Sequence, residues 1–200
     1  RAMADYRVRR ERMKMPAAAP VIPAADRAAA QAMLAGSAPV LCEWHARPVL
    51  AAYGIGSGEA GSLAHSPAEA EAAVRALARP AALKVQSPDI PHKTEAGAVA
   101  LNVSSDGARG SYERVLAAAK RHAPDAHIDG VLVQPMAPPG REVILGVNRD
   151  ATWGPLLMVG LGGVLVEARG DVALAPAARE LAAARALIGR LKGAAVLGAF

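Results

Sequence analysis

The residues best suited to chemistry lie in one short segment, LKVQSPDIPHKTEAG, at positions 83–97. Lys84 stands between Leu83 and Val85 in a strand-like run, so its side chain points to the opposite face and must meet solvent or an anion. The loop that follows adds Lys93 and ends in a glycine. Ammonium groups and free backbone N–H groups together can hold a phosphate. The pattern leaves two readings open, a phosphate-binding lysine and a lysine that reaches into solvent from a half-exposed strand.

His92 lies in the same loop, directly before Lys93. An imidazole is partly neutral at pH 7 and can accept a phosphoryl group, so one interpretation is a nucleophile or a proton carrier. The other interpretation is a solvated loop histidine, which the position alone favours. The residues themselves do not decide between them.

Further candidate groups follow in the C-terminal half of the chain. Glu142 begins an expected strand, Asn148-Arg149-Asp150 fits a turn, and Glu167 ends a strand-like run. The run Gly160-Leu161-Gly162-Gly163 fits a tight turn between strands. It is weak as a phosphate-binding signature because no capped helix follows it.

The other histidines and the cysteine predict no metal centre. His45, His65, His122 and His127 have no neighbouring ligands at metal-binding spacing, so we expect surface or core histidines. Cys42 is the single cysteine and can build neither a disulfide framework nor a cysteine zinc site. The metal-ligating residues of the chain therefore stay unassigned.

Composition favours a soluble α/β protein and excludes several classes. The 200 residues are 52% hydrophobic, which is enough for a core, and no apolar run approaches the roughly 18 residues of a membrane span. Residues 1–14 carry four of the five net positive charges, and only 3% of the residues are aromatic. We therefore expect no nucleic-acid partner and no membrane contact. One cysteine fits a reducing compartment, and we expect the cytoplasm.

Strands and helices alternate in the first part of the chain, and strands cluster in the second. Hydrophobic periodicity predicts strands at 81–86, 98–103, 130–136, 142–147, 155–160 and 163–168. Helices are predicted at 25–35, at 43–53 with Pro48 inside or at its start, after the capping box of Ser66, Pro67 and Glu69, at 111–121 and at 177–191. The pattern predicts an α/β (α+β) fold with a basic tail and Ala/Pro-rich linker at 1–40, a first lobe at 41–125, and a second, apparently truncated lobe at 126–200.

Three blocks of the sequence resemble a known family over roughly three quarters of the chain. They are EWHARPVLAAYGI, ALKVQSPDIPHKTEAGAVALNV, and GVLVQPMAPPGREVILGVNRDATWGPLLMVGLGGVLVEARGDVALAPA. Their order and spacing resemble the ATP-grasp domain of the nucleoside-diphosphate-forming acyl-CoA synthetases. That group includes ADP-forming acetyl-CoA synthetase and, more distantly, the β subunit of succinyl-CoA synthetase. The resemblance implies an ATP-grasp fold of two α/β lobes with a nucleotide cleft between them.

The resemblance also implies roles for the residues of the first candidate segment. In the family, the lysine that matches Lys84 contacts nucleotide phosphates, and the histidine that matches His92 carries a phosphoryl group between the acyl-CoA module and ADP. Lys93 would help to offset the charge of that phosphoryl group. The implied reaction converts an acid, CoA and ATP reversibly into acyl-CoA, ADP and phosphate.

Two further sites are implied in the same way. The segment Gln134-Pro135-Met136 matches the hinge that receives adenine through main-chain hydrogen bonds, and Glu142 matches an acidic residue that faces the nucleotide. The family usually has glutamate at the position of Pro135, and proline removes one backbone donor there.

The resemblance sets expectations for cofactors and partners. ATP or ADP binds with Mg²⁺, whose usual ligands would lie beyond residue 200, and CoA is bound by other modules. We expect the acyl-CoA ligase and CoA-binding modules on the same chain or on a partner subunit, with a carboxylic acid as substrate. The sequence does not decide whether the protein forms a homo-oligomer.

Two alternative functions remain at this stage. One is an ATP-grasp regulatory or binding module fused to a protein lysine acetyltransferase. The other is an ATP-grasp ligase that joins a carboxylate to an amine. His92 favours the acyl-CoA synthetase over the second alternative, because a direct acyl-phosphate ligase needs no histidine carrier. It does not separate the synthetase from the regulatory module.

Overall fold

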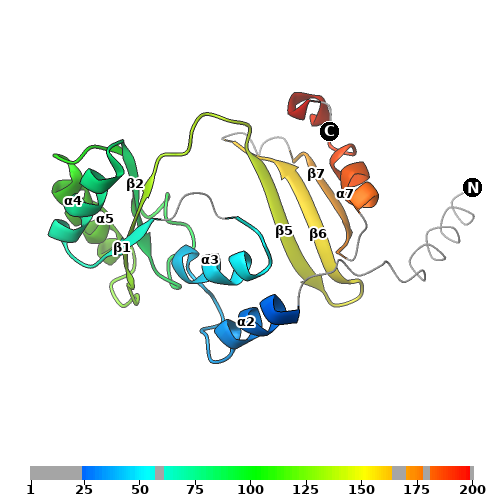
Figure 1. Cartoon of the computed structure of the whole chain (residues 1–200), viewed down its shortest axis with the longest axis horizontal. Coiled ribbons are helices and arrows are strands. Elements are labelled where there is room, and N and C mark those ends of the chain that lie inside the picture. The colour runs from blue at the N-terminus through cyan, green and yellow to red at the C-terminus, as the bar shows by residue number, and fades with distance from the viewer. Residues whose placement is uncertain (1–23, 57–60, 164–169, 178–180, 199–200) are drawn as a thin grey trace, which may run out of the picture. The chain divides into compact units, whose positions relative to one another are not determined.

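The computed structural model describes residues 24–56, 61–163, 170–177 and 181–198 (Figure 1). They form two compact units, one of Ile22–Pro138 and one that contains Pro139–Phe200. Both combine helices with an antiparallel sheet, so the predicted mixed α/β class is confirmed. We expected a lobe boundary near residue 125. The chain instead divides after Pro138, because the strand after residue 129 pairs into the first sheet.

The first unit is built on a four-stranded sheet in the order β1-β4-β2-β3. The strands are β1 (Ser62–Ala64), β2 (Ala81–Gln86), β3 (Val99–Val103) and β4 (Gly130–Pro135), and each neighbouring pair is antiparallel. The predicted strands at 81–86, 98–103 and 130–136 are confirmed to within a residue. β1 was not predicted, because three residues are too few for a recognisable period.

One face of this sheet is covered by α4 (Pro67–Leu77) and α5 (Ala108–His122), which pack against each other (Figure 1). The core between them contains Leu83, Val85, Val131 and Val133 from the two central strands, all almost fully buried. Successive strand residues alternate between faces, so the intervening residues of β2 and β4 point to the other side of the sheet.

The predicted capping box starts α4. Ser66 is the N-cap, and its hydroxyl accepts a hydrogen bond from the Glu69 N–H at 3.2 Å. The Glu69 carboxylate in turn accepts a hydrogen bond from the His65 N–H at 2.8 Å. The first bond satisfies a donor that the first helical turn leaves free, and the second ties the residue before the N-cap to the helix. Together they fix where the helix begins.

The opposite face of the sheet carries Lys84 and Gln86 of β2 and Gln134 of β4, and it meets α3 (Glu43–Ala52). α2 (Ala24–Leu34) packs against α3 and buries Ala30. Figure 1 places α3 on the side of the sheet away from α4 and α5. The helix predicted at 25–35 within the Ala/Pro-rich segment is thus confirmed as α2, and it packs within the first unit.

The second unit is an antiparallel meander in the order β5-β6-β7. Its strands are β5 (Val143–Asp150), β6 (Gly154–Leu161) and β7 (Val172–Pro176), and they are followed by α7 (Leu181–Ile188) and the short 3₁₀ helix η1 (Ala194–Leu197). Leu187 and Leu191 pack on Val159, Ala173 and Ala175.

The structure of the second unit differs from the prediction in several details. Asn148-Arg149-Asp150 ends strand β5 instead of forming a turn, and Asp150 closes the following turn by accepting the Thr152 and Trp153 N–H groups at 2.8 Å. β7 was not predicted. The predicted strand at 163–168 and Glu167 lie outside the described residues apart from Gly163. The predicted helix at 177–191 corresponds to α7, which ends at Ile188, and positions 178–180 lie outside the described residues.

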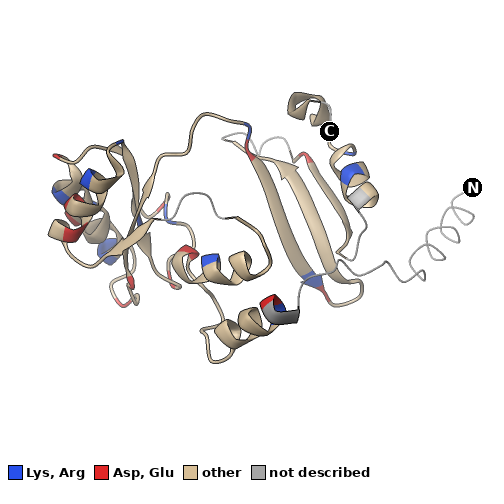
Figure 2. Ribbon diagram, viewed as in Figure 1, with Lys and Arg blue, Asp and Glu red and all other residues tan. Residues whose placement is uncertain are grey.

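Charged side chains are common on the helices and rare on the strands. Figure 2 shows charged residues along α4 and α5, whereas β5 and β6 carry them only at the Arg149–Asp150 end. Within the described ranges, no helix combines the length and the apolar character that crossing a bilayer would require.

Candidate functional site

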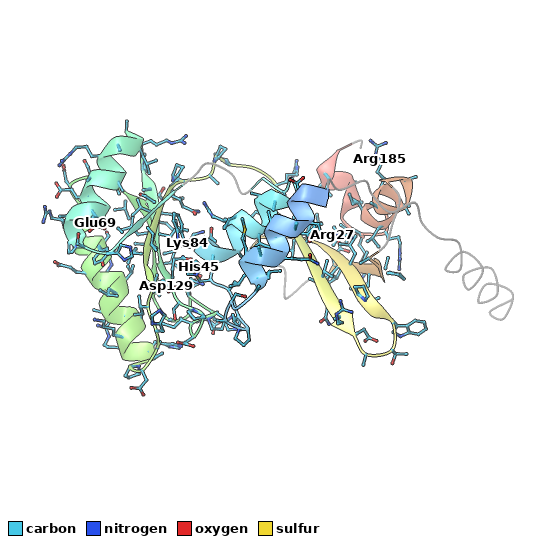
Figure 3. The ribbon with its side chains drawn as sticks, turned by 60° about the horizontal axis from the view of Figure 1, so that its bottom comes forward. Arg27, His45, Glu69, Lys84, Asp129 and Arg185 are labelled. Carbon is cyan, nitrogen blue, oxygen red and sulfur yellow. The ribbon has the colours of Figure 1, made fainter. Side chains whose placement is uncertain are left out.

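Lys84 belongs to a chain of polar contacts that joins β2, α3 and β4. Its ammonium nitrogen lies 3.2 Å from Glu43 Oε2. The other oxygen of Glu43 accepts from Arg47 at 2.7 Å, and Arg47 donates in turn to Gln134 Oε1 at 2.5 Å. In Figure 3, Lys84 lies on the side of the sheet away from Glu69 and α4. The structure thus brings together two of the predicted site residues, Lys84 and Gln134, through a helix that the prediction had left without a role.

Gln86 fixes the first turn of α3 on the sheet. Cys42 is the N-cap residue of α3, but its side chain makes no capping bond. Gln86, which is fully buried, takes that role by accepting the Trp44 N–H at 2.9 Å. Its amide nitrogen donates to the carbonyls of Lys84 and Val85. Because a buried amide must be hydrogen-bonded, this arrangement holds α3 in one position over β2.

The position of α3 explains why Glu43 and Arg47 face the sheet. They are four residues apart, so they lie on one side of the helix and pair with each other. Burial alone would raise the pKa of Glu43, but the hydrogen bond from Arg47 and the charge of Lys84 outweigh it and hold that pKa below its usual value. Glu43 is therefore ionised at neutral pH. An incoming phosphate would compete with this carboxylate for Lys84.

Arg47 keeps one donor free within the part of the chain that the structure describes. Its Nε is buried and has no hydrogen-bond partner there. The side chain is 13% exposed, and its terminal nitrogen already binds Glu43 and Gln134. A buried guanidinium donor without an acceptor is costly, so this side of the cluster is suited to an additional anionic or carbonyl group. Sequence reasoning missed Glu43 and Arg47, although their four-residue spacing in the predicted helix at 43–53 was a usable signal.

His92 is exposed on the loop between β2 and β3. Its side chain is 76% exposed, and its Nδ1 lies 3.9 Å from an oxygen of Glu95, which is equally exposed. Packed side chains do not enclose the imidazole. Both ends of the loop are anchored, because Ile90 and Ala96 are buried in the core of the first unit. The ring is thus accessible on a segment whose base is fixed.

The loop folds on itself around Lys93. The Lys93 carbonyl accepts from the Ala98 N–H at 2.8 Å, and the Thr94 carbonyl accepts from the Gly97 N–H at 3.0 Å. Gly97 has φ of +65°, a conformation that glycine adopts without strain. Lys93 is half-buried and directly follows His92 in the chain.

The expected adenine-binding segment ends β4. The Met136 N–H donates to the Pro80 carbonyl at 3.1 Å, and Pro135 has no N–H. The side chain of Gln134 accepts from Arg47. The Met136 N–H is therefore used within the fold and Pro135 offers none, which leaves this segment few main-chain donors for a ligand.

Glu142 lies in the second unit, directly before β5, and is exposed. Its carbonyl accepts the Gly162 N–H at 2.7 Å. A Cβ on Gly162 would lie 2.5 Å from the Cβ of Glu142, so only glycine permits this approach. The glycine run predicted as a turn therefore includes a close contact that positions Glu142.

The described residues do not gather an evident magnesium site. Their one group of three metal-capable side chains that converge is Cys42, His45 and Asp129. Mg²⁺ prefers oxygen ligands in an octahedral arrangement, and a thiol and an imidazole do not fit it.

A sheet-and-helix unit with a lysine on a central strand and an accessible histidine on the next loop fits one class of nucleotide-binding proteins. Residues 32–200 match the family model described as ATP-grasp domain. The chain therefore belongs to the ATP-grasp domain family.

Relatives define the group within that family. The chain is 40% identical over 141 residues to the β subunit of acetate–CoA ligase [ADP-forming] II from Pyrococcus furiosus, covering 70% of this chain and 59% of the relative. It is 41% identical over 135 residues to acetate–CoA ligase [ADP-forming] I from Archaeoglobus fulgidus, covering 66% of this chain and 20% of the relative. The chain thus spans between a fifth and three fifths of these curated relatives.

Solved structures of acetyl-coenzyme A synthetase 1 from Ca. Korarchaeum cryptofilum are similar as well. A complex with coenzyme A, Ca-AMPCP and HgCl+ is 37% identical, with a TM-score of 0.76, and the match covers 85% of this chain and 74% of that one. A complex with coenzyme A and Mg-AMPPCP, with its phosphohistidine segment pointing towards the nucleotide binding site, is 30% identical, with a TM-score of 0.65, and the match covers 88% and 75%. The chain groups with the ADP-forming acetyl-CoA synthetases, as the sequence predicted.

Proposed function

We propose that this chain is the nucleotide-binding part of an ADP-forming acyl-CoA synthetase, which converts an acid, CoA and ATP into acyl-CoA, ADP and phosphate. The observation that carries the proposal is the accessible imidazole of His92 on the loop that leaves the lysine-bearing strand β2. The phosphohistidine segment named for the Ca. Korarchaeum cryptofilum enzyme supports the same role for this loop.

His92 is the proposed phosphoryl carrier. In the direction of acyl-CoA formation, a neutral imidazole nitrogen attacks the γ-phosphorus of ATP, the bond to the bridging oxygen breaks, and ADP leaves. The phosphohistidine then gives its phosphoryl group to the carboxylate of the acid, and the CoA thiol displaces phosphate from the acyl phosphate. The exposure of His92 suits this role, because the ring must reach two reaction partners in turn.

Lys84 is the proposed contact to the nucleotide phosphates, with Lys93 offsetting charge near the carrier. The ammonium group of Lys84 pairs with Glu43 in the structure, so phosphate binding exchanges one anionic partner for another. Arg47 keeps Glu43 neutralised during that exchange, because the two are joined at 2.7 Å. Lys84 can therefore move to a phosphate without leaving the half-buried carboxylate of Glu43 unpaired.

We assign adenine recognition to the segment Gln134-Pro135-Met136 and propose that Glu142 faces the nucleotide. Since the Met136 N–H is bound within the fold, we expect the carbonyl oxygens of the segment to accept from the adenine amino group. Mg²⁺ bound with the nucleotide supplies charge neutralisation to the transferred phosphoryl group. Its ligands are not assigned to the described residues.

The second unit supports the expectation of further modules. Ile144, Leu145, Val147 and Leu174 on β5 and β7 are exposed, Leu145 by 71% and Val147 by 67%. The strand register puts Leu145 and Val147 on one face of the sheet and Ile144 and Leu174 on the other. Exposed apolar side chains on both faces of a small sheet are typical of a contact with further polypeptide. We propose that the acyl-CoA ligase and CoA-binding modules, on the same chain or on a partner subunit, provide that contact.

The test is phosphoryl labelling of the complete enzyme, purified with the modules that its activity requires. Incubation with γ-labelled ATP and Mg²⁺ should label the wild-type protein, and the label should be acid-labile, as expected for phosphohistidine. His92→Asn should abolish both labelling and acyl-CoA formation while ADP still binds. His122→Asn is the matched control, because His122 is an exposed histidine at the end of α5. Undiminished acyl-CoA formation by His92→Asn would refute the carrier role.

A further inference from the structure

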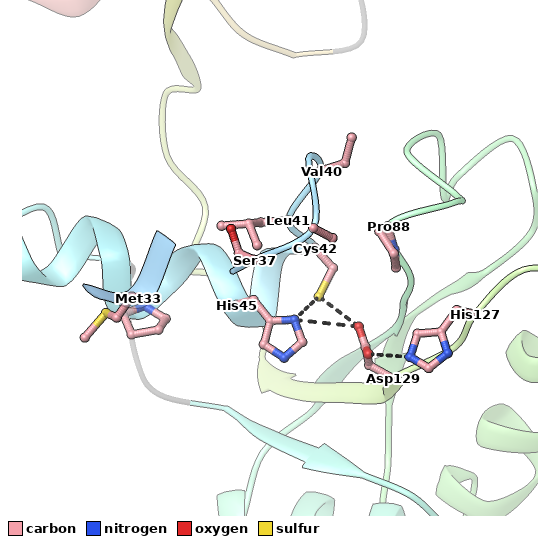
Figure 4. A pocket seen from close by; sticks show the side chains of 11 residues that line it. Met33, Ser37, Val40, Leu41, Cys42, His45, Pro88, His127 and Asp129 are labelled. Carbon is pink, nitrogen blue, oxygen red and sulfur yellow. Dashed lines mark hydrogen bonds and ion pairs between the residues drawn. The ribbon is translucent and has the colours of Figure 1, made fainter. Parts of the chain in front are cut away.

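The first unit contains a pocket that none of the residues assigned above lines. It has a volume of about 500 Å³ and lies between the start of α3 and the segments around Pro88 and His127. Most of its wall is apolar, with Val40 and Leu41 among the lining residues. Figure 4 shows three side chains of different chemistry meeting there, those of Cys42, His45 and Asp129.

The donor atoms of these three side chains are almost equally spaced. Cys42 Sγ lies 3.4 Å from His45 Nδ1 and 3.4 Å from Asp129 Oδ2, and the latter two atoms are 3.7 Å apart. Zinc bonds of about 2.3 Å to sulfur and about 2.0–2.1 Å to nitrogen and oxygen, at tetrahedral angles, separate such donors by roughly 3.3–3.6 Å. An ion can therefore sit among the three atoms with shifts of only a few tenths of an ångström.

We propose that Cys42 Sγ, His45 Nδ1 and Asp129 Oδ2 form a binding site for one zinc-like divalent metal ion. A thiolate, an imidazole and a carboxylate are the ligand types that favour Zn²⁺ and Co²⁺ over Mg²⁺ and Ca²⁺. Three protein ligands leave the fourth tetrahedral position to water or to a molecule in the pocket.

The fold explains how the donors come together. Cys42 and His45 are three residues apart at the start of α3 and therefore lie on one side of the helix. The Cys42 side chain is released from the N-cap role because Gln86 caps Trp44 instead. Asp129 is 87 positions further along the chain and directly precedes β4, where its N–H donates to the Gln86 carbonyl. Gln86 thus holds both halves of the site.

His127 positions the carboxylate. Its Nε2 lies 3.1 Å from Asp129 Oδ1, the oxygen that does not face Cys42. Ligating carboxylates are commonly held by a hydrogen bond to their second oxygen, which fixes their orientation. His127 is therefore a positioning residue. The expectation that His45 and His127 have no ligand neighbours was wrong, because both rings lie beside Asp129. The spacing in the sequence hid the contact with Asp129.

A hydrogen-bonded network without metal is the competing explanation. Burial and the neighbouring Asp129 carboxylate raise the pKa of the Cys42 thiol, so the metal-free thiol keeps its proton and donates it to Asp129. Metal binding forms the metal–sulfur bond and releases that proton to solvent. The two explanations differ in whether the protein takes up one metal equivalent through Cys42.

The experiment uses the complete, tag-free protein after removal of metal with a chelator. Co²⁺ is titrated first, because a cobalt–thiolate bond gives a charge-transfer absorption in the near ultraviolet. Zn²⁺ affinity is then measured by competition with a chromophoric chelator. We expect one equivalent of Co²⁺, the charge-transfer band, and displacement by Zn²⁺.

Variants connect the binding to the named residues. Cys42→Ala should abolish the charge-transfer band, and Cys42→Ala and His45→Ala should each weaken Zn²⁺ binding by more than about 100-fold, beyond the 10- to 100-fold typical of outer-shell residues. His127→Ala should cost about 10-fold and keep the band. His122→Ala is the matched control and should bind as the wild type does. Circular dichroism checks that each variant folds.

Two outcomes would overturn the proposal. One is a wild-type protein that takes up no stoichiometric Co²⁺ or Zn²⁺. The other is Zn²⁺ affinity that stays unchanged in folded Cys42→Ala and His45→Ala, since binding would then occur elsewhere. Neither outcome affects the labelling of His92, which lies outside the pocket.

Discussion

Replacing Lys84 with methionine separates the charge of this side chain from its packing. Methionine keeps much of the aliphatic length, so the part of Lys84 that lies against the sheet remains. The ammonium group is lost, and with it the 3.2 Å contact to Glu43 and the proposed contact to nucleotide phosphate. The first loss acts on folding and the second on binding, so the two can be measured apart.

The structure gives the expected sizes of these two effects. Lys84 and Glu43 are 25% and 33% exposed, and such a partly solvated pair contributes about 1 kcal/mol or less to stability. Glu43 also keeps Arg47 as a partner. A hydrogen bond from an ionised group to an anionic ligand contributes about 1.5–3 kcal/mol. At about 1.4 kcal/mol per tenfold, the Kd for ADP should rise by roughly 10- to 100-fold.

Calorimetric titration with ADP measures the binding, and urea unfolding measures the stability. Lys120→Met is the matched control. Lys120 is exposed in the last turn of α5, and its replacement removes the same charge from the chain. Equal ADP affinity in Lys84→Met and the wild type would refute the phosphate contact. A loss of affinity that matches an equal loss of folded protein would assign Lys84 to the fold alone.

Two further predictions concern the stability of the units. The hydrogen bond from Arg109 is the main reason why the pKa of Glu71 lies below its usual value of 4.5. The stability that this pair contributes is therefore present above pH 4.5, and it is lost as the pH falls through the lowered pKa that Glu71 has in the folded protein. Glu71→Gln should therefore have a lower melting temperature than the wild type at pH 7, and the difference between the two proteins should become smaller in acid. Glu113→Gln, at an exposed position of α5, should melt as the wild type does. Equal melting temperatures of Glu71→Gln and the wild type at pH 7 would contradict this prediction. Gly162→Ala should destabilise the second unit by roughly 1–3 kcal/mol, because the new Cβ lies 2.5 Å from Glu142 Cβ and close to its backbone. Urea unfolding followed by Trp153 fluorescence measures it. Gly110→Ala is the control, because a Cβ added at this position of α5 would meet open space, and it should leave the stability unchanged or raise it. Equal unfolding free energies of the two variants would refute the prediction that the contact with Glu142 requires glycine.

Local signals in the sequence predicted much of the fold. β2 has the predicted bounds and α4 begins where it was predicted to begin, since an alternating strand and a capping box are each specified by their own residues. β7 was missed for a physical reason. Its residues VALAP are apolar on both faces, so they show no alternation, although Ala173 and Ala175 are buried and Val172 and Leu174 are exposed. Which face of such a strand is covered depends on α7, and that is tertiary information.

The same distinction applies to the site. Lys84 and His92 could be selected from the sequence, because a lysine inside a strand and a histidine in the following loop are unusual in themselves. Glu43 lies 41 positions before its partner Lys84, and its selection required knowledge of the packing of α3 on β2. The expected lobe boundary failed similarly, because the pairing of β4 with β2 connects segments that the sequence separates by a helix.

The start of α3 makes two sets of contacts, and both depend on Gln86. Glu43 and Arg47 turn towards the sheet and neutralise Lys84, while Cys42 and His45 turn towards the pocket and Asp129. Both directions depend on the hydrogen bond from the Trp44 N–H to Gln86, a fully buried side chain on the same strand as Lys84. A metal ion bound by Cys42, His45 and Asp129 would add a second connection between α3 and the segment before β4. It would therefore restrict the motion of Glu43 relative to Lys84, and metal occupancy would couple to how readily Lys84 exchanges its carboxylate for a phosphate.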